Sequence, residues 1–199
     1  MSDRHFGNKD GFSRRAFLKG SSAVAAATAL QAQTAAAADN DGDQVVSGKQ
    51  KIQLNVNGQN HSAEVEPRTT LLDVLRYQLE LTGAKPVSAD GSSGASTVLI
   101  DGKPATASTT LAIACTGKKI QTVEGIGADD PVIKAFIKHD AEQCGFCTPG
   151  FVVAVRAFLN KNPQASEQQI RDGLNSNICR CGTYANIIEA ANAVVKGGV

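Results

Sequence analysis

The sequence contains no tryptophan, and only 5% of its 199 residues are aromatic. Proteins that bind single-stranded nucleic acids usually stack the bases on aromatic side chains, so this shortage argues against that class. A strong positive charge is also missing, because the formal net charge is +1. Residues 1–38 carry five Lys or Arg and two Asp or Glu, a charge of +3, which leaves −2 for the remainder. We therefore expect no nucleic-acid partner.

The usual signs of a substrate site are lacking as well. The chain has only three histidines, and none stands in a pattern typical of a Ser-His-Asp triad or of a histidine metal site. The segment Gly125-Ile126-Gly127 has no following glycine and no strand-to-helix phosphate loop, so nucleotide binding is not indicated. We expect no substrate site in this chain.

The N-terminal apolar run, residues 23–30, is too short and too rich in alanine to remain as a membrane anchor. It follows Arg14-Arg15-Ala16-Phe17-Leu18-Lys19 and precedes small residues that end at Ala38, the order of an export signal. Adjacent arginines followed by Phe-Leu-Lys match the twin-arginine type, which exports folded proteins. We expect residues 1–38 to be a cleaved signal peptide, residues 39–49 to be a polar linker, and the mature protein to be periplasmic without a membrane anchor.

Four of the five cysteines form two close pairs. Cys144 and Cys147 are separated by two residues, and Cys179 and Cys181 by one. Together they supply four thiolates, enough to close a tetrahedral metal site or to hold a [2Fe-2S] cluster. The sequence therefore predicts a metal centre.

Two other uses of these cysteines stay open from their spacing. Structural disulfides occur in exported proteins; a Cys-x-Cys pair is awkward to join to itself, which leaves cross-pairing between the two motifs. A structural zinc site is the second alternative, although such sites usually place two or more residues between paired cysteines. Gly145 and Gly182 beside the cysteines favour a backbone that wraps closely around a sulfide-bridged cluster. The pattern favours an iron–sulfur cluster over both alternatives.

Residues 50–126 have the pattern of a small α+β unit. Residues 52–56 alternate apolar and polar side chains as a strand does, and Asn57-Gly58 is a strong hairpin signal. Thr70 begins a capping-box-like helix start with Asp in place of Glu. Further strands are predicted over residues 98–100 and 120–123.

The remaining segment, residues 127–199, is predicted to be all helical. Pro131 fits a first helical turn, and Ser166 opens a capping box with Gln169. Apolar side chains recur at helical spacing over residues 132–137, 151–159, 170–174 and 184–195. Four short helices can pack as a compact bundle, with the cysteine pairs at helix ends or interhelix turns.

The residues around the cysteine pairs resemble the proximal [2Fe-2S] motif of the xanthine oxidase family. They read Gln143-Cys144-Gly145-Phe146-Cys147-Thr148-Pro149-Gly150 and Asn177-Ile178-Cys179-Arg180-Cys181-Gly182-Thr183-Tyr184. The likeness is to the iron–sulfur small subunit of molybdenum hydroxylases, of the exported aldehyde oxidoreductase type, and runs through most of residues 50–196. It implies a plant-ferredoxin-like β-grasp domain at 50–126 and a four-helix [2Fe-2S] domain at 127–199.

The chain departs from that family at a second, distal cluster. Family members bind it in the β-grasp domain through cysteines spaced C-x4-C-x2-C-x11-C, but the corresponding positions here are Ser88, Ser93, Ser96 and Ser108. A serine hydroxyl ionises far less readily than a thiol, whose pKa is about 8.5, and it is a harder ligand. We therefore expect a single [2Fe-2S] cluster, held by Cys144, Cys147, Cys179 and Cys181. Cys115 matches no ligand of the family and is expected to be a buried free thiol.

The resemblance implies an electron-transfer subunit of a molybdenum-containing aldehyde or N-heterocycle oxidoreductase. Its partner would be a large subunit that binds the molybdenum–pterin cofactor, with Cys181 against the pterin and Gln143 at the same interface. Electrons would normally continue to an FAD-binding subunit or another acceptor, and loss of the distal cluster should make that transfer slow or absent. The alternative function is a non-catalytic exported scaffold with a structural zinc or disulfides in its bundle.

Overall fold

The computed structural model describes residues 46–198. The predicted signal peptide, residues 1–38, and most of the linker at 39–49 lie outside the described residues. Residues 46–198 belong to one compact unit. Within this range, no helix combines the length and the apolar character that crossing a bilayer would need.

The first element is the predicted hairpin. Strands β1 (Gln50–Val56) and β2 (Gln59–Val65) pair antiparallel, and the two turn residues have positive φ angles, 53° at Asn57 and 81° at Gly58. Positive φ at both central residues is the requirement of a type I′ turn, which Asn-Gly satisfies well. The prediction from the sequence is confirmed.

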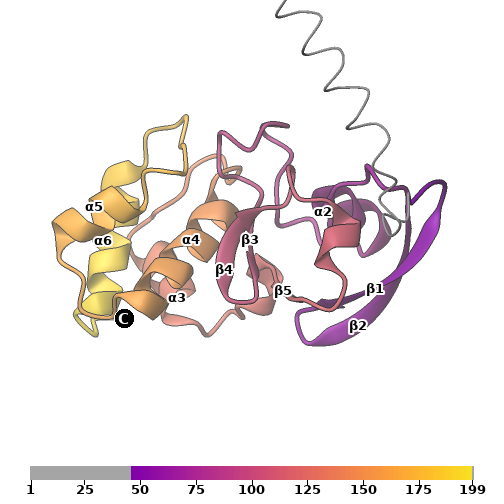
Figure 1. Ribbon diagram of the computed structural model, residues 1–199. Coiled ribbons are helices and arrows are strands. Elements are labelled where there is room, and N and C mark those ends of the chain that lie inside the picture. The colour runs from indigo at the N-terminus through magenta and orange to yellow at the C-terminus, as the bar shows by residue number, and fades with distance from the viewer. Residues whose placement is uncertain (1–45, 199) are drawn as a thin grey trace, which may run out of the picture. The chain divides into compact units, whose positions relative to one another are not determined.

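A mixed five-stranded sheet grows from this hairpin, in the order β2-β1-β5-β3-β4 (Figure 1). Its other strands are β3 (Thr97–Ile100), β4 (Lys103–Thr106) and β5 (Lys119–Gln121). Strand β5 pairs parallel with β1 and antiparallel with β3. The long connection between β2 and β3 carries a helix, which covers the apolar side of the hairpin.

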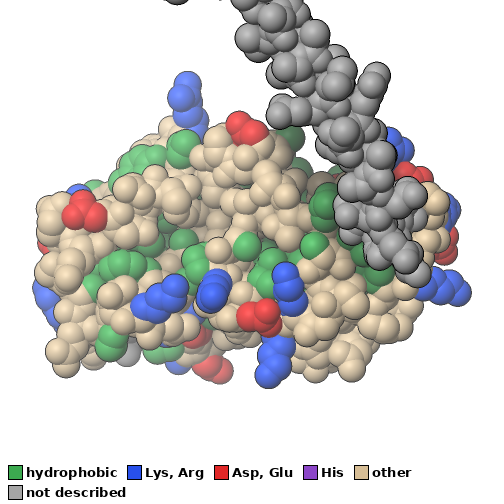
Figure 2. Space-filling view, in the orientation of Figure 1, with side chains coloured by type: hydrophobic (Ala, Val, Ile, Leu, Met, Phe, Trp, Pro, Cys, Tyr) green, Lys and Arg blue, Asp and Glu red, His purple; other side chains and the backbone are tan. Residues whose placement is uncertain are grey.

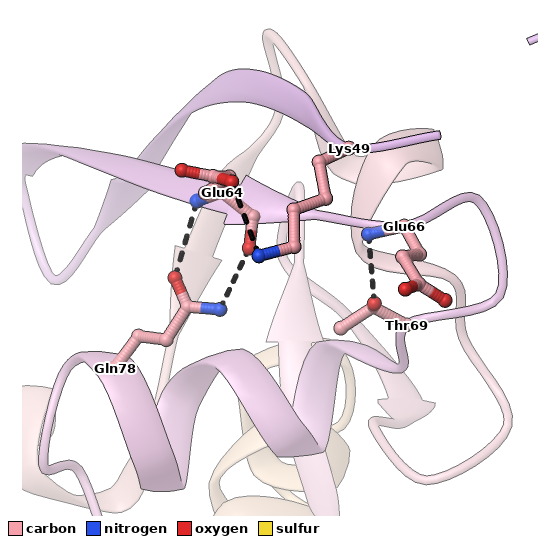
Figure 3. Close-up of polar contacts among 5 residues, drawn as sticks. All are labelled: Lys49, Glu64, Glu66, Thr69 and Gln78. Carbon is pink, nitrogen blue, oxygen red and sulfur yellow. Dashed lines mark hydrogen bonds and ion pairs between the residues drawn. The ribbon is translucent and has the colours of Figure 1, made fainter. Parts of the chain in front are cut away.

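This helix starts where the sequence predicts. Thr70 caps α2 (Leu71–Asp73) by accepting the Asp73 N–H, and the chain continues as one π-helical turn, η1 (Val74–Gln78). The side chain of Gln78 bonds both backbone groups of Glu64 in β2, at 3.2 Å and 2.9 Å (Figure 3). Figure 3 also shows Lys49 paired with Glu64 at 3.5 Å. The two Gln78 hydrogen bonds hold the helical segment against the edge of the hairpin.

One strand prediction is wrong at its end. The strand predicted over 120–123 stops at Gln121, and Val123 lies in a 3-10 turn, η3 (Val123–Gly125). The reason is a side chain: Asn57 accepts the Thr122 N–H at 2.9 Å and donates to the Thr122 hydroxyl at 3.0 Å. The amide group of Asn57 thus takes the place of a strand partner, and the chain is free to turn. A further 3-10 turn, η2 (Ala112–Cys115), precedes β5.

The four predicted helices are all present. They are α3 (Pro131–Lys138), α4 (Thr148–Lys161), α5 (Glu167–Gly173) and α6 (Tyr184–Val195). Asp130 caps α3 ahead of Pro131, and Ser166 forms a complete capping box with Gln169 on α5. Each cap satisfies backbone N–H groups that a helix start leaves without partners.

Two apolar cores organise residues 46–198. One gathers side chains of the sheet, α2 and η1, and the other gathers side chains of α3 to α6. A smaller cluster of Leu99, Val153 and Ala157 joins β3 to α4, which lies beside β3 and β4 in Figure 1. The domain boundary at 126/127 stays a prediction. On the face shown in Figure 2, hydrophobic side chains lie between charged side chains of both signs.

Candidate metal centre

The four paired cysteines lie at the end of the helical segment where α4 and α6 begin. Cys147 is the residue before the first turn of α4, Cys144 lies in the bend that precedes it, and Cys179 and Cys181 lie between α5 and α6. All five cysteines of the chain are free thiols. The disulfides considered from the sequence are therefore not formed in this structure.

The sulfurs meet as two pairs drawn from opposite motifs. Cys147 and Cys179 are buried and close enough to shift each other's pKa, and we call them the buried pair. Cys144 and Cys181 are exposed and also contact each other, and we call them the exposed pair. Within each motif the two cysteines are also close: charge repulsion from Cys144 raises the pKa of Cys147, and charge repulsion from Cys179 raises the pKa of Cys181. The structure thus places the four cysteines that the sequence singles out as two pairs, and their joint role as ligands stays a prediction.

The two thiols of the buried pair have pKa values shifted in opposite directions. Burial, the hydrogen bond with Cys179 and the nearby charges of Cys179 and Cys144 raise the pKa of Cys147 to about 12. Burial also acts to raise the pKa of Cys179, but hydrogen bonds from the hydroxyl and N–H of Thr183, from Cys147 and from the Gly182 N–H outweigh it and lower that pKa to about 7. A Cys179 thiolate therefore accepts a hydrogen bond from the protonated Cys147 thiol, and a metal cation can replace that proton.

In the exposed pair, the pKa of Cys181 is raised. The backbone of Cys144 acts to lower the pKa of Cys181, but the Cys144 thiol, slight burial and repulsion from Cys144 and Cys179 raise it overall.

Among residues 46–198, no three His, Cys, Asp or Glu side chains are grouped closely enough to hold one metal ion. Two pairs of sulfurs match two thiolates on each iron of a [2Fe-2S] cluster better than four ligands on one zinc.

The backbone around the cysteines leaves room for a bulky group. Gly145 and Gly182 have positive φ angles of 79° and 87°, and a Cβ atom built on either would meet no atom within 4 Å. The four soft thiol donors, one of them a ready thiolate, are the ligand set that a sulfide-bridged iron cluster takes. The residues present therefore fit a [2Fe-2S] cluster.

Other exposed side chains lie next to the cysteines of the exposed pair in the sequence. Gln143 is exposed next to Cys144. Phe146 and Ile178 are 58% and 51% exposed, although both are large and apolar. Exposed apolar residues beside a centre are typical of a surface that a partner covers.

The four serines also come together, as two hydrogen-bonded pairs. The hydroxyls of Ser88 and Ser93 lie 2.7 Å apart, and the Ser96 hydroxyl donates to Ser108 at 3.0 Å. Ser88 and Ser108 line one pocket of about 240 Å³. The oxygens also accept backbone N–H groups: Ser88 from Ser93 at 3.0 Å, and Ser96 from Ser108 at 3.3 Å. These hydroxyls, already bonded to one another and hard as ligands, do not fit a sulfide-bridged cluster.

The sequence analysis missed two hydroxyl groups that contact Cys179, one member of the buried pair. The Thr183 hydroxyl lies 3.0 Å from the Cys179 sulfur, and the Tyr184 hydroxyl accepts the Cys179 N–H at 2.7 Å. Both residues stand in the quoted motif, so their proximity was visible, but the atoms that they contact were not. Cys115 is fully buried, as predicted, and its thiol faces the Leu111 carbonyl oxygen at 3.6 Å.

Comparisons with known proteins agree with this geometry. Residues 122–192 match the family described as [2Fe-2S] binding domain. The aldehyde oxidoreductase iron-sulfur-binding subunit PaoA of Escherichia coli K12 is 38% identical over 195 residues, covering 89% of this chain and 85% of that protein. The nicotine 6-hydroxylase small subunit of Paenarthrobacter nicotinovorans is 40% identical over 146 residues, covering 72% of this chain and 88% of that protein.

A solved structure shows the same fold. Quinoline 2-oxidoreductase from Pseudomonas putida 86 contains a chain that superposes with a TM-score of 0.70 at 38% identity, covering 77% of this chain and all of that one. The β-grasp and helical [2Fe-2S] architecture expected from the sequence is thus confirmed. This chain belongs to the family of [2Fe-2S] electron-transfer small subunits of xanthine oxidase-type molybdenum hydroxylases.

Proposed function

We propose that Cys144, Cys147, Cys179 and Cys181 hold the chain's single [2Fe-2S] cluster. The observation that carries this proposal is the contrast between two sites. The four thiols lie as two pairs, and the pKa of one of them, Cys179, is lowered. The four serine hydroxyls, in contrast, form hydrogen bonds with one another. The second cluster of the family is therefore proposed to be absent.

The residues around the cysteines divide the site into a sheltered side and an open side. When bound, the cluster supplies a one-electron acceptor and donor. Cys147 and Cys179 keep one side away from water, because both are at least nine-tenths buried. Cys144 and Cys181 keep the other side at the surface. Electrons are thus proposed to enter by way of the exposed pair.

The partner at this open side is proposed to be a molybdenum-binding subunit. PaoA is named as the iron-sulfur-binding subunit of an aldehyde oxidoreductase, and the nicotine 6-hydroxylase relative is named as a small subunit. Phe146 and Ile178 supply exposed apolar area for docking, with Gln143 and Cys181 proposed to face the pterin cofactor. The substrate that the complex oxidises is proposed to be an aldehyde or an N-heterocycle, bound by the partner subunit.

Onward electron transfer is proposed to be impaired in this chain. An FAD-binding subunit or another acceptor would receive electrons through the β-grasp segment, where the four serines replace the second set of ligands. Without a cluster there, electrons must cross that segment in one long step. The complex is proposed to be periplasmic, exported in folded form by the signal at residues 1–38 and free of a membrane anchor after cleavage.

Metal analysis of the mature protein tests the cluster count. We expect about two irons per chain, a red-brown colour and a paramagnetic signal after one-electron reduction. A content of about four irons per chain would overturn the claim of a single cluster. Zinc in place of iron, with a colourless protein, would support the scaffold function instead.

Two cysteine variants test the ligand assignment. Cys147→Ser should lose most of the iron and the visible absorption, because a hydroxyl replaces a thiolate ligand. Cys115→Ala is the matched control, since it removes a buried thiol that contacts none of the four paired cysteines. Retention of full iron content by Cys147→Ser would contradict the assignment.

A further inference from the structure

Thr183 stands at the N-terminal cap of α6 but does not cap the helix. Threonine at this position normally bonds a backbone N–H of the first helical turn with its hydroxyl. Here the side chain makes no such bond, and the backbone angles, φ −71° and ψ 19°, differ from the extended conformation of a capping residue. The hydroxyl of Thr183 is therefore available for a contact other than a helix cap.

The Thr183 hydroxyl contacts the sulfur of Cys179. The Thr183 hydroxyl oxygen lies 3.0 Å from it, with Thr183 only 4% exposed and Cys179 only 5% exposed. Once Cys179 is a metal-bound thiolate it has no proton to give, so the hydroxyl must be the donor. Because the contact is buried, water cannot easily replace it.

Tyr184 holds the same cysteine independently. Its hydroxyl accepts the Cys179 N–H at 2.7 Å, and its ring packs edge-on against Phe151 of α4, with ring centroids 6.1 Å apart. This anchor does not involve the Thr183 hydroxyl. Removal of the hydroxyl should therefore leave the Cys179 backbone in place while deleting the bond to its sulfur.

We propose that Thr183 is a positioning residue that raises the reduction potential of the cluster by donating its hydroxyl hydrogen to the Cys179 sulfur. This inference rests on the proposed function, in which Cys179 is a cluster ligand. A hydrogen bond to a ligand sulfur withdraws negative charge and stabilises the reduced cluster, which carries one more electron. Hydrogen bonds to the sulfurs are among the factors that set the potentials of such clusters.

Redox titration of the purified mature protein tests the proposal. Thr183→Val keeps the branched shape and loses the hydroxyl, so its potential should fall. At a fixed ambient potential within the titration, the ratio of reduced to oxidised cluster should drop roughly tenfold, which is about 59 mV for a one-electron couple. Thr183→Ser keeps the hydroxyl and should restore the potential of the parent protein.

Two further variants keep the test decisive. Thr183→Ala provides a smaller hydroxyl-free side chain in case valine prevents cluster loading, and it should show the same fall. Thr110→Val is the matched control, because it removes a partly buried hydroxyl that donates to the Thr106 carbonyl oxygen at 2.9 Å, in the sheet segment. Its potential should equal that of the parent.

The outcomes separate this inference from the proposed function. Absence of iron and of a paramagnetic signal in the parent protein would overturn the proposed function itself. A loaded cluster whose potential is the same in the parent, in the hydroxyl-free variants and in Thr183→Ser would overturn only the role of Thr183. A fall in the hydroxyl-free variants with recovery in Thr183→Ser would support it, because a purely structural role would change stability and not the potential.

Discussion

The side-chain amide of Asn177 donates a hydrogen bond to the carbonyl oxygen of Gly94, 2.9 Å away and 83 residues earlier in the chain. The next residue, Ile178, donates its N–H to the Ser93 carbonyl oxygen at 3.0 Å. Two loops are joined in this way: the one that leads into Cys179 and the one that carries three of the four serines. The contact is buried, since Asn177 is only 4% exposed.

Asn177→Ala should destabilise the protein by about 1 kcal/mol, because it removes a buried hydrogen bond between two loops while Gly94 keeps the N–H and hydroxyl of Thr97 as donors. Urea unfolding followed by circular dichroism measures the change. Asn60→Ala is the control: its side chain bonds Asn55 at the surface, and a loss there should stay within about 0.5 kcal/mol. Equal effects of the two substitutions would contradict a special role for the Asn177 contact.

Ser93→Ala tests what the serine pairs do. It removes the partner of Ser88 and an acceptor for the Ala95 N–H, so we expect a loss of about 1 kcal/mol in unfolding free energy. Iron content should not change, because no cluster is expected there. Ser92→Ala, which affects an exposed contact with Asp90, should change neither quantity. A drop of about two irons in Ser93→Ala alone would show that the hydroxyls are ligands after all.

Asp130 and its neighbour Asp129 form a natural matched pair. Asp130 caps α3 through the Val132 N–H at 2.8 Å and forms a largely buried ion pair with Arg156 of α4. Asp130→Ala should cost roughly 2 to 3 kcal/mol, because both the cap and the partner of a sheltered cation are lost. The Asp129 side chain is fully exposed and pairs with Lys134 at the surface, so Asp129→Ala should have an effect within about 0.5 kcal/mol in the same denaturation assay.

Cys115 should make stability depend on pH in the alkaline range. Burial raises the pKa of this thiol, whereas the unfolded chain should titrate at its ordinary value of about 8.5. Above that pH the unfolded state releases a proton that the folded state retains, so the free energy of unfolding falls as pH rises. Unfolding at about pH 7 and about pH 9.5 should show a smaller decline for Cys115→Ala than for the parent. Identical declines would contradict the shift.

Much of the fold was predictable because its signals are local. Asn57-Gly58 supports a type I′ turn by itself, and Ser166 with Gln169 completes a capping box within one helical turn. The end of β5 was not predictable, because it depends on Asn57 in the turn between β1 and β2, which bonds Thr122 across 65 positions. Local patterns carry no information about a side chain that arrives from so far away.

The candidate centre divides in the same manner. The spacing of the cysteines within each motif and the presence of serines at 88, 93, 96 and 108 are properties of the sequence, and the expectation of one cluster follows from those residue types. Which sulfur meets which was settled by the packing of α4 against the segment before α6, where Cys147 joins Cys179 and Cys144 joins Cys181. Contact between the two motifs exists only after the helices have packed. The Thr183 hydroxyl lies only four residues from Cys179, but its use at the sulfur and not as a helix cap was visible only in the backbone geometry at the start of α6.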